Sequence, residues 1–469
     1  MTKSPEQGWL PDFLYRDGRF ESGVALFANA EGRIQRLSRS PEDLKAAQRL
    51  NHQALLPGLV NAHSHSFQRA LRARTERRTR AGRDTFWTWR EAMYHAANSL
   101  SPEDIYRVAR MAFLEMLASG ITTVGEFHYL HHAPGGTPYE NRNLLAEKIL
   151  CAARETGLRI ALLRTAYSRA GFQKPLNPGQ VRFMTPNPDD FISDTEALRT
   201  SITKGFSPDR AWVGIAPHSI RAVHLPYIER VASYAAQNGL VLHMHVAEQQ
   251  AEIEACQTEF GLRPIELLYE HGVLSERFTG VHVIHVNERE IDYLAKARAH
   301  VCACATTERN LGDGIAPAER WAALSIPVCY GSDSNIQIDL WEDARELEYH
   351  LRLEKLERAV LAPDAERESL SRRLFDSATR VGAESLGAPA GSLEPGLAAD
   401  FLTVDLDDLS IAGADAGSLL SHIVFSLERT AIRQVCVGGE PVIQDGRHPL
   451  QEEIVREFRE TQQKLWEPA

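Results

Sequence analysis

A helix followed directly by a strand is expected in residues 101–124, which read SPEDIYRVARMAFLEMLASGITTV. Ser101 can cap the helix, and Pro102 suits the first helical position. Apolar residues then recur at helical spacing as far as Gly120, where the helix is predicted to end. The β-branched run that begins at Ile121 favours a short strand.

The same alternation of helix and strand continues from about Leu56 to Ala388 of this 469-residue chain. Helices that end near Gly157 and at Gly239 again precede apolar strands. Eight candidate strands result: Leu59–His63, Ile121–Phe127, Leu158–Arg164, Trp212–His218, Leu240–Val246, Val281–His285, His300–Cys304 and Val328–Asp333. Because eight parallel strands with helical crossovers close a barrel, the predicted fold class is α/β, a (β/α)8 TIM barrel.

The two chain ends have a different pattern from the middle. Residues 1–55 and 391–446 contain short strand-like pieces separated by Gly, Pro and Asp. We expect them to pair into a small β-sandwich domain formed by both chain ends, beside a barrel over residues 56–390. Residues 447–469 are predicted to form a C-terminal helical segment.

Composition narrows the class of protein. With 52 Lys and Arg against 63 Asp and Glu, the net charge is −11, which argues against a nucleic-acid or anionic-membrane partner. No apolar run has the length of a membrane-spanning helix, and the first residues do not resemble a secretory signal. The six Cys are scattered without a CxxC pair. We therefore expect a cytoplasmic enzyme with reduced thiols.

Residues that bind metals gather at the predicted strand ends. His63 and His65 end the first strand with both imidazoles on one face. His245 ends the fifth strand, His282 lies on the sixth, and Asp333 ends the eighth. In such barrels catalytic residues project from the carboxyl ends of the strands, so these side chains are expected to meet. Imidazoles with one carboxylate suit a divalent metal, zinc above all.

Seven longer motifs extend this pattern over the whole predicted barrel. They are LLPGLVNAHSHSFQRA (55–70), DTFWTWREAMY (84–94), VGEFHYLHH (124–132), APHSIRAV (216–223), HMHVAEQQAEIEACQ (243–257), TTERNLGDGIAP (306–317) and YGSDSN (330–335). The first resembles many deaminases of the amidohydrolase superfamily. The narrower motifs FWTWRE, EFHYLHH, HVAEQQ and NLGDGIAP resemble the formimidoylglutamate deiminase family within it.

The resemblance implies an amidohydrolase-type barrel with one zinc ion per subunit. Its ligands would be four residues: His63, His65, His245 and Asp333. A lysine on the fourth strand bridges two metals in some amidohydrolases, and Trp212–His218 contains none, which favours a single metal. We interpret His243, deeper on the same strand face as His245, as a core histidine.

The resemblance also implies the chemistry, the hydrolysis of N-formimino-L-glutamate to N-formyl-L-glutamate and ammonia in L-histidine degradation. A bound divalent metal lowers the pKa of water to about 7 and makes hydroxide available. Glu248 would carry protons to the nitrogen that leaves as ammonia. His282 would hold the attacking water, and Asp333 could accept its proton. His285 is interpreted as structural.

Two arginines, Arg90 and Arg221, match the family's substrate-holding residues. A planar guanidinium binds a carboxylate through two hydrogen bonds, which suits a dicarboxylate substrate. Gln68, Tyr129 and His218 match positions that add hydrogen bonds to the substrate. A homodimer is also expected from the resemblance.

Other interpretations stay open. A related deaminase could act on a purine, pterin or other amidine-bearing ring, and a catalytically inactive scaffold would typically lack metal ligands. Seven arginines lie between Arg69 and Arg83, with a single Glu; we interpret them as a solvated segment, or in part as an attraction for a dianionic substrate. Two residues depart from the family pattern: Ser66 follows the second metal-binding histidine, and Arg309 could alter substrate choice.

Overall fold

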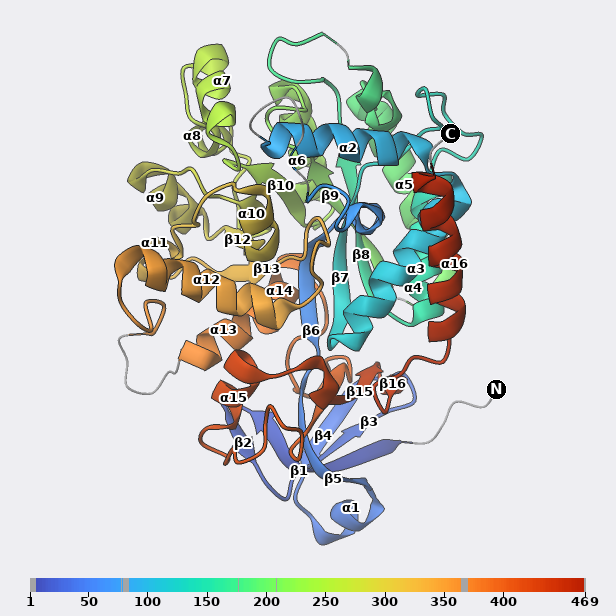
Figure 1. Ribbon diagram of the computed structural model, residues 1–469, viewed down its shortest axis with the longest axis vertical. Coiled ribbons are helices and arrows are strands. Elements are labelled where there is room, and N and C mark those ends of the chain that lie inside the picture. Colours follow the sequence, from blue (N-terminus) through green and yellow to red (C-terminus); the bar gives the residue numbers. More distant parts are fainter. Residues whose placement is uncertain are drawn as a thin grey trace.

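The computed structural model describes residues 6–76, 78, 84–175, 177–207, 209–363 and 370–467. In this part of the chain two sheets are present, each of eight strands. The parallel sheet forms the barrel, and the mixed sheet lies at its foot (Figure 1). The predicted fold class is therefore confirmed.

The barrel strands run in sequence order around the sheet. They are β6 (Leu59–Ser64), β7 (Ile121–His128), β8 (Arg159–Ala166), β9 (Ala211–Pro217), β10 (Leu242–Val246), β11 (Phe278–His282), β12 (His300–Ala303) and β13 (Val328–Tyr330). The first and last strands meet just beyond β13, where Asp333 N donates to His63 O at 3.0 Å and His65 N donates to Asp333 O at 2.9 Å. The barrel thus closes at three of the predicted metal-binding residues.

Two predicted strands are wrong in their bounds: the eighth, expected over Val328–Asp333, ends at Tyr330 as β13, and the sixth is displaced. We expected Val281–His285, whereas β11 spans Phe278–His282. The backbone turns into the left-handed region at His282 (φ 74°) and Val283 (φ 55°), which ends the extended conformation there. His285 consequently lies beyond the strand, in the loop that follows it.

Helices surround the barrel, and the predicted helix of the first motif is α3 (Pro102–Ala118). Ser101 Oγ accepts from Asp104 N at 3.2 Å, and Asp104 Oδ2 accepts from Ser101 N at 3.0 Å, so the start of α3 is a capping box. The other helices of the barrel region are η1 (Ser66–Leu71), α2 (Phe86–Ser99), α4 (Leu144–Thr156), η2 (Pro178–Phe183), α5 (Pro188–Gly205), α6 (Leu225–Gln237), α7 (Gln250–Phe260), α8 (Pro264–Glu270), α9 (Glu288–Ala297), α10 (Ala305–Leu311), α11 (Ala318–Ala323), α12 (Leu340–Lys355), α13 (Leu370–Ala378) and α14 (Arg380–Leu386).

The mixed sheet combines both ends of the chain. Its strands are β1 (Gln7–Arg16), β2 (Arg19–Glu21), β3 (Ala25–Ala28), β4 (Ile34–Ser38), β5 (Gln48–Pro57), β14 (Phe401–Asp405), β15 (Ile432–Val437) and β16 (Glu440–Gln444). Strand β5 pairs with β1 on one side and with β14 on the other, and so joins the two chain ends. Trp9, Leu55 and Phe401 are buried together between these strands.

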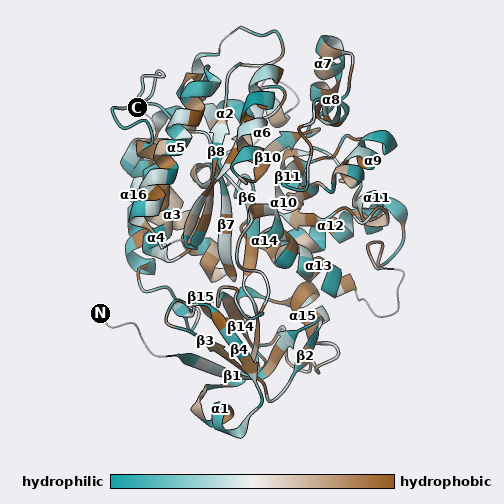
Figure 2. Ribbon diagram, turned by 180° about the vertical axis from the view of Figure 1, so that it is seen from behind, coloured by the Kyte–Doolittle hydropathy of each residue, from teal (hydrophilic) through white to brown (hydrophobic). Residues whose placement is uncertain are grey.

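The remaining helices are α1 (Pro41–Ala46), α15 (Leu419–Ser426), η3 (Arg429–Ala431) and α16 (Gln451–Trp466). Helix α16 lies along α3 on the outside of the barrel, where it buries Ile454 and Phe458 and exposes a largely hydrophilic face (Figure 2). Helix α2 crosses the end of the barrel opposite the mixed sheet (Figure 1). Among the described residues, no helix is long and apolar enough to cross a membrane.

Candidate active site

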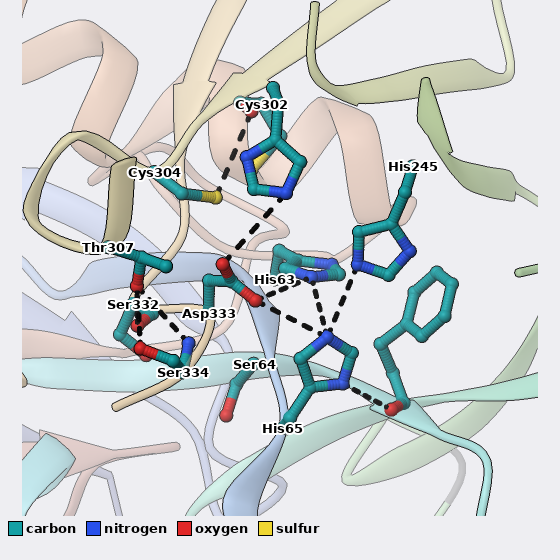
Figure 3. Close-up of polar contacts among 12 residues, drawn as sticks. His63, Ser64, His65, His245, Cys302, Cys304, Thr307, Ser332, Asp333 and Ser334 are labelled. Carbon is teal, nitrogen blue, oxygen red and sulfur yellow. Dashed lines mark hydrogen bonds and ion pairs between the residues drawn. The ribbon is translucent and has the colours of Figure 1, made fainter. Parts of the chain in front are cut away.

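Three imidazoles and one carboxylate converge where the barrel strands end (Figure 3). They belong to His63, His65, His245 and Asp333, whose potential ligand atoms all lie within 4.8 Å of one another. Nε2 of His65 is 3.2 Å from Nε2 of His63 and 3.3 Å from Nε2 of His245. Oδ1 of Asp333 is 3.4 Å from Nε2 of His63 and 3.3 Å from Nε2 of His65.

Backbone carbonyls fix the tautomers of two of these histidines. Nδ1 of His65 lies 2.9 Å from Phe127 O, and Nδ1 of His245 lies 3.0 Å from His218 O. A carbonyl oxygen only accepts, so each Nδ1 carries the proton and each Nε2 presents a lone pair. The two lone pairs face each other and repel unless a cation lies between them. The donor set therefore fits a divalent metal ion, with second contacts that orient the ligands.

Burial keeps this cluster in the protonation state that a metal requires. Burial lowers the pKa of His63 to about 3, and burial beside other imidazoles holds the pKa of His245 well below its ordinary value. Burial alone would raise the pKa of Asp333, but its close contacts with the imidazoles of His63 and His65, together with the charge on His282, hold it well below its ordinary value. Neutral imidazoles beside an ionised carboxylate can all act as ligands.

The backbone is strained at the strand ends that carry the site. Ala247, His282 and Asp333 have φ values of 55°, 74° and 45°, in the left-handed region that costs non-glycine residues about 1–3 kcal/mol. Hydrogen bonds to His63 and His65 hold the backbone of Asp333 in place. The strain aims the side chains of His282 and Asp333 at the cluster instead of along their strands.

His282 lies between three carboxylates. Its Nδ1 is 3.2 Å from Glu308 Oε1, while its Nε2 is 4.0 Å from Glu248 Oε1 and 3.9 Å from Asp333 Oδ2. Burial opposes a charge on His282, but these carboxylates outweigh it and raise the pKa of His282 to about 10. A bound dication would lower this pKa again. Nε2 of His282 thus faces both Glu248 and Asp333. Glu308 contacts the other ring nitrogen, Nδ1, and so fixes the orientation of the ring.

A pocket opens over the cluster and collects nearly every residue that the sequence predicts for the site. Ten predicted residues line it: His65, Gln68, Arg90, Tyr129, His218, Arg221, His245, Glu248, His282 and Asp333. His63 is completely buried below it. The rest of the lining is mainly aromatic: Phe86, Trp89, Met93, Tyr94, Tyr167, Phe183 and Leu311.

Two guanidinium groups face this pocket beside the same indole ring. The Cζ atoms of Arg90 and Arg221 lie 4.4 Å and 6.0 Å from the ring centre of Trp87. Nε of Arg90 is buried without a hydrogen-bond partner, and within the described residues no carboxylate pairs with this guanidinium. Among the residues that the structure describes, Arg221 forms only long ion pairs, at 3.8 Å to Glu248 and 3.9 Å to Glu252. Both groups have donors left for an anionic ligand.

Sequence reasoning missed several acidic groups around the pocket. Burial raises the pKa of Glu252 to about 7, although Arg221 opposes the shift. Burial also raises the pKa of Asp313 to about 8, with a further contribution from Glu248. Glu252 lies one helical turn after Glu248 in the sequence, while Glu308 and Asp313 belong to the motif TTERNLGDG. The sequence signal that could have identified these acidic residues is that they lie within the motifs.

Three other residues of interest have contacts outside the cluster. Nε2 of His243 is 2.9 Å from Ser385 O, and Nε2 of His285 is 2.8 Å from Asp313 O. Arg309 does not line the pocket; its guanidinium pairs with Glu346 of α12 at 2.7 Å. The expectation that Arg309 influences substrate choice therefore has no contact to support it.

The arginine run after the first strand lies only partly in the described residues. Arg69 and Arg72 both pair with Glu115, at 2.6 Å and 2.8 Å, and so connect η1 with α3. Arg77 and residues 79–83 lie outside the described residues. Ser66 donates its backbone N–H and its hydroxyl to the buried carboxylate of Glu126, at 2.7 Å and 2.6 Å.

Comparisons with known proteins agree with this geometry. The amidohydrolase family matches residues 54–442. A formimidoylglutamate deiminase from Pseudomonas aeruginosa is 37% identical over 455 residues, which cover 97% of each chain. The crystal structure of an amidohydrolase from Brucella melitensis is 33% identical, with a TM-score of 0.89 over 98% of this chain and 99% of that one.

A more distant structure has the same fold. An adenosine deaminase from Xanthomonas campestris, determined with bound zinc, has a TM-score of 0.82 over 98% of each chain at 20% identity. The likeness to formimidoylglutamate deiminases that the motifs predict is confirmed by the P. aeruginosa relative. The chain therefore belongs to the amidohydrolase family and is a hydrolase that acts on carbon–nitrogen bonds.

Proposed function

We propose that the protein hydrolyses N-formimino-L-glutamate to N-formyl-L-glutamate and ammonia. One observation carries this proposal. Arg90 and Arg221 open on the same pocket as the cluster of His65, His245 and Asp333. A substrate with two carboxylates and an amidine-like formimino group matches a pocket lined by both two guanidinium groups and a metal-binding cluster.

The metal would be held by His63, His65, His245 and Asp333, and we propose one zinc ion per subunit. Nitrogen and oxygen donors at a strand-borne site suit zinc, and the pocket leaves room for water and substrate. When bound, the ion lowers the pKa of water from 15.7 to about 7 and so supplies a nucleophile at neutral pH.

Glu248 would supply the protons that this reaction needs. Proton donation to the imino nitrogen makes the formimino carbon more electrophilic, and a second proton lets that nitrogen leave as ammonia. Oδ2 of Asp333 and Nε2 of His282 are 3.9 Å apart, so both can contact one attacking water. Glu248 would take one proton of the water and give it to the imino nitrogen. Asp333 would take the other as the carbon–oxygen bond forms, and that proton passes on to the nitrogen as the carbon–nitrogen bond breaks and the carbonyl forms, so both protons of the water end in ammonia.

The substrate carboxylates would be held by Arg90 and Arg221. Gln68 Nε2 donates to the hydroxyl oxygen of Tyr129 at 2.8 Å, and both side chains are buried in the pocket wall. Together with His218, they are placed to add hydrogen bonds to a carboxylate or to the formimino nitrogen. We further propose a cytoplasmic homodimer that acts in L-histidine degradation, in keeping with the P. aeruginosa relative named formimidoylglutamate deiminase.

The second candidate is a deaminase of a purine or pterin ring, and the aromatic side chains of Phe86, Trp89 and Phe183 favour it. A ring substrate would leave the buried Nε of Arg90 without a partner and Arg221 with only its long ion pairs, so the dicarboxylate is preferred. The test is ammonia release from N-formimino-L-glutamate by purified protein of measured metal content. Release from guanine or adenosine, with none from N-formimino-L-glutamate, would reverse the assignment.

A further inference from the structure

A second buried glutamate lies behind the pocket, one helical turn after Glu248. Glu252 belongs to the first turn of α7, which lies at the end of the barrel opposite the mixed sheet (Figure 1). Its side chain is almost completely buried, and it does not line the pocket. Neither the motifs nor the proposed mechanism assigns it a role.

One carboxylate oxygen of Glu252 is anchored to the backbone. Oε1 accepts from the N–H of Ala247 at 3.3 Å. Ala247 is the left-handed residue directly before Glu248, with a φ of 55°, and its carbonyl oxygen accepts from His285 N at 2.9 Å. The side chain of Glu252 is thus fixed to the turn that carries Glu248 into the pocket, and this contact also fixes the direction of its other oxygen.

The other oxygen of Glu252 faces Arg221. Oε2 of Glu252 lies 3.9 Å from Nη1 of Arg221, and Oε2 of Glu248 lies 3.8 Å from Nη2 of the same guanidinium. Both distances exceed the length of an N–H···O hydrogen bond, about 2.7–3.2 Å. Among the described residues, Oε2 of Glu252 and Nη1 of Arg221 are buried atoms without a hydrogen-bond partner. The guanidinium therefore lies nearly midway between two carboxylates and bonds to neither.

Another buried arginine shows the arrangement that a direct carboxylate partner produces. Arg159 pairs with Asp400 at 2.8 Å, and both side chains are buried. A buried ion pair loses its hydration and is compensated only when hydrogen bonds form within it, which favours such direct contact. Arg221 differs because each of its two Nη atoms faces a different carboxylate. The attraction of Glu252 for the guanidinium therefore competes with that of Glu248.

Loss of the charge on Glu252 would leave Arg221 to Glu248 alone. Burial would lower the pKa of Arg221, but Glu252 and then Glu248 raise it above its ordinary value, so the guanidinium stays charged. It would close on Glu248 and form direct hydrogen bonds, as Arg159 does with Asp400. Glu248 would then be held in an ion pair, which hinders its uptake and release of protons, and Arg221 would have fewer donors for a ligand.

We propose that Glu252 is a positioning residue, which holds the guanidinium of Arg221 away from Glu248. It thereby keeps Glu248 free for proton transfer and keeps Arg221 free for a substrate carboxylate. This inference rests on the proposed function, because proton transfer by Glu248 and carboxylate binding by Arg221 both belong to it. It adds a residue outside the pocket lining on which both steps depend.

The first test is a calorimetric binding measurement with glutarate, which has two carboxylates and no formimino group. The metal-loaded protein is used at a pH of about 8.5, because burial raises the pKa of Glu252 to about 7 and its carboxylate must be ionised. Glu252→Gln removes the charge and leaves an amide oxygen that can accept from Ala247 N. We expect glutarate to bind about fivefold more weakly, or weaker still. Loss of a negative charge would by itself strengthen the binding of a dianion, so equal or tighter binding would overturn the proposal.

A double variant separates positioning from damage to the start of α7. If Arg221 is held by Glu248 in Glu252→Gln, then Glu248→Gln in the same chain should release it. We therefore expect the double variant, Glu248→Gln with Glu252→Gln, to bind glutarate at least as tightly as the wild type. Binding by the double variant as weak as that of Glu252→Gln alone would show a structural defect and refute the assignment.

Kinetics with N-formimino-L-glutamate supplies the second readout. Glu252→Gln should lower kcat about tenfold or more with metal content unchanged, since the proton carrier is held in an ion pair. Glu259→Gln is the matched control on the same helix, because Glu259 pairs with Arg169 at 2.7 Å and does not line the pocket. We expect this control to change kcat less than about twofold. Equal losses in the two variants would indicate general damage to α7 and contradict the positioning role.

The two readouts keep this inference distinct from the proposed reaction. The expected glutarate affinities of the single and double variants support the positioning role even if no formimino compound is hydrolysed, in which case only the proposed function fails. Rapid hydrolysis by the wild type, together with unchanged glutarate binding and unchanged kcat in Glu252→Gln, would instead reject the positioning role and keep the function.

Discussion

The floor and the wall of the pocket are built in different ways. The floor is the cluster of His63, His65, His245 and Asp333, which lie on or directly after barrel strands. Its tautomers are fixed by backbone carbonyls, and its ends are joined by the hydrogen bonds that close the barrel. The wall is the set of side chains from α2 and from the segments that follow β7, β8 and β9, and side-chain amides and aromatic rings hold it.

This difference separates chemistry from recognition. A site on strand ends moves only if the barrel moves, so it suits a metal whose ligands must stay within a few tenths of an ångström. A wall on a helix and loops can change without disturbing the barrel. Variants of the floor should therefore abolish reaction, while variants of the wall should change substrate affinity.

The largest effect is expected from His65→Ala. This change removes a ligand at the centre of the floor, since Nε2 of His65 contacts both His63 and His245. Bound metal should be lost, and ammonia release should fall on the order of 10⁴-fold or more. Metal analysis alongside the assay checks both. His243→Asn is the control, because His243 lies on β10 with His245 but bonds to Ser385, and this variant should keep its metal. A variant of His65 that stays fully active would show that the floor is not the reaction centre.

Glu248→Gln should come next. The side chain remains the same size but can no longer carry a proton to the leaving nitrogen. We expect kcat to fall about 10³-fold with metal content unchanged, because proton transfer of this kind contributes 10²- to 10⁴-fold. Steady-state kinetics measures kcat, and metal analysis measures the metal content. A rise in KM at constant kcat would instead show that Glu248 acts like the wall residues, in substrate binding and not in proton transfer.

Arg90→Ala probes the wall itself. Because Arg90 is the guanidinium without a described carboxylate partner, its loss should mainly remove substrate affinity. We expect KM for the diacid to rise about 10- to 100-fold, with kcat changed much less and metal retained. A loss confined to kcat would contradict the separation of floor and wall.

The sequence predicted the floor more completely than the wall for a physical reason. Metal ligands have few suitable residue types, and strand periodicity together with barrel order brings His63, His65, His245 and Asp333 to one place. Strand Val281–His285 was placed wrongly because the left-handed turn at His282 follows from the site and not from local propensity. Even so, the sequence predicted correctly that His282 lies near the cluster, because His282 is at the end of its strand.

The wall depends on contacts between residues far apart in the chain, which no local sequence pattern predicts. Arg90 and Arg221 were predicted only through resemblance, and Tyr94 shares a helix face with Arg90 at a spacing of four residues, a signal that also fits ordinary packing. Gln180 lies 13 residues after Tyr167 and 86 after Tyr94, so their contact is visible only in the folded chain. Glu308 was missed because its partner, His282, is 26 residues away.

Acidification should lower the stability of the fold because a neutral histidine, His243, is buried below the floor. Burial, opposed by a hydrogen bond to Ser385, lowers the pKa of His243 from 6.5 to about 4. Below pH 6.5 the unfolded chain takes up this proton and the folded chain does not, so His243 favours unfolding as pH falls toward 4, by about 3 kcal/mol at most. His243→Asn should therefore lose less stability than wild type between pH 7 and pH 4 in urea unfolding. Parallel losses would indicate that His243 is already protonated in the fold.

The smallest effect is expected from Arg309→Ala, and it marks where the wall ends. The guanidinium of Arg309 is 40% exposed and pairs with Glu346 of α12, while its neighbour Leu311 lines the pocket. An ion pair this exposed contributes at most about 1 kcal/mol to stability. We expect KM for the diacid to change less than twofold, against the large change for Arg90→Ala measured beside it. A KM change of fivefold or more would mean that α10 also takes part in recognition, and the boundary of the wall would have to be moved outward to include Arg309.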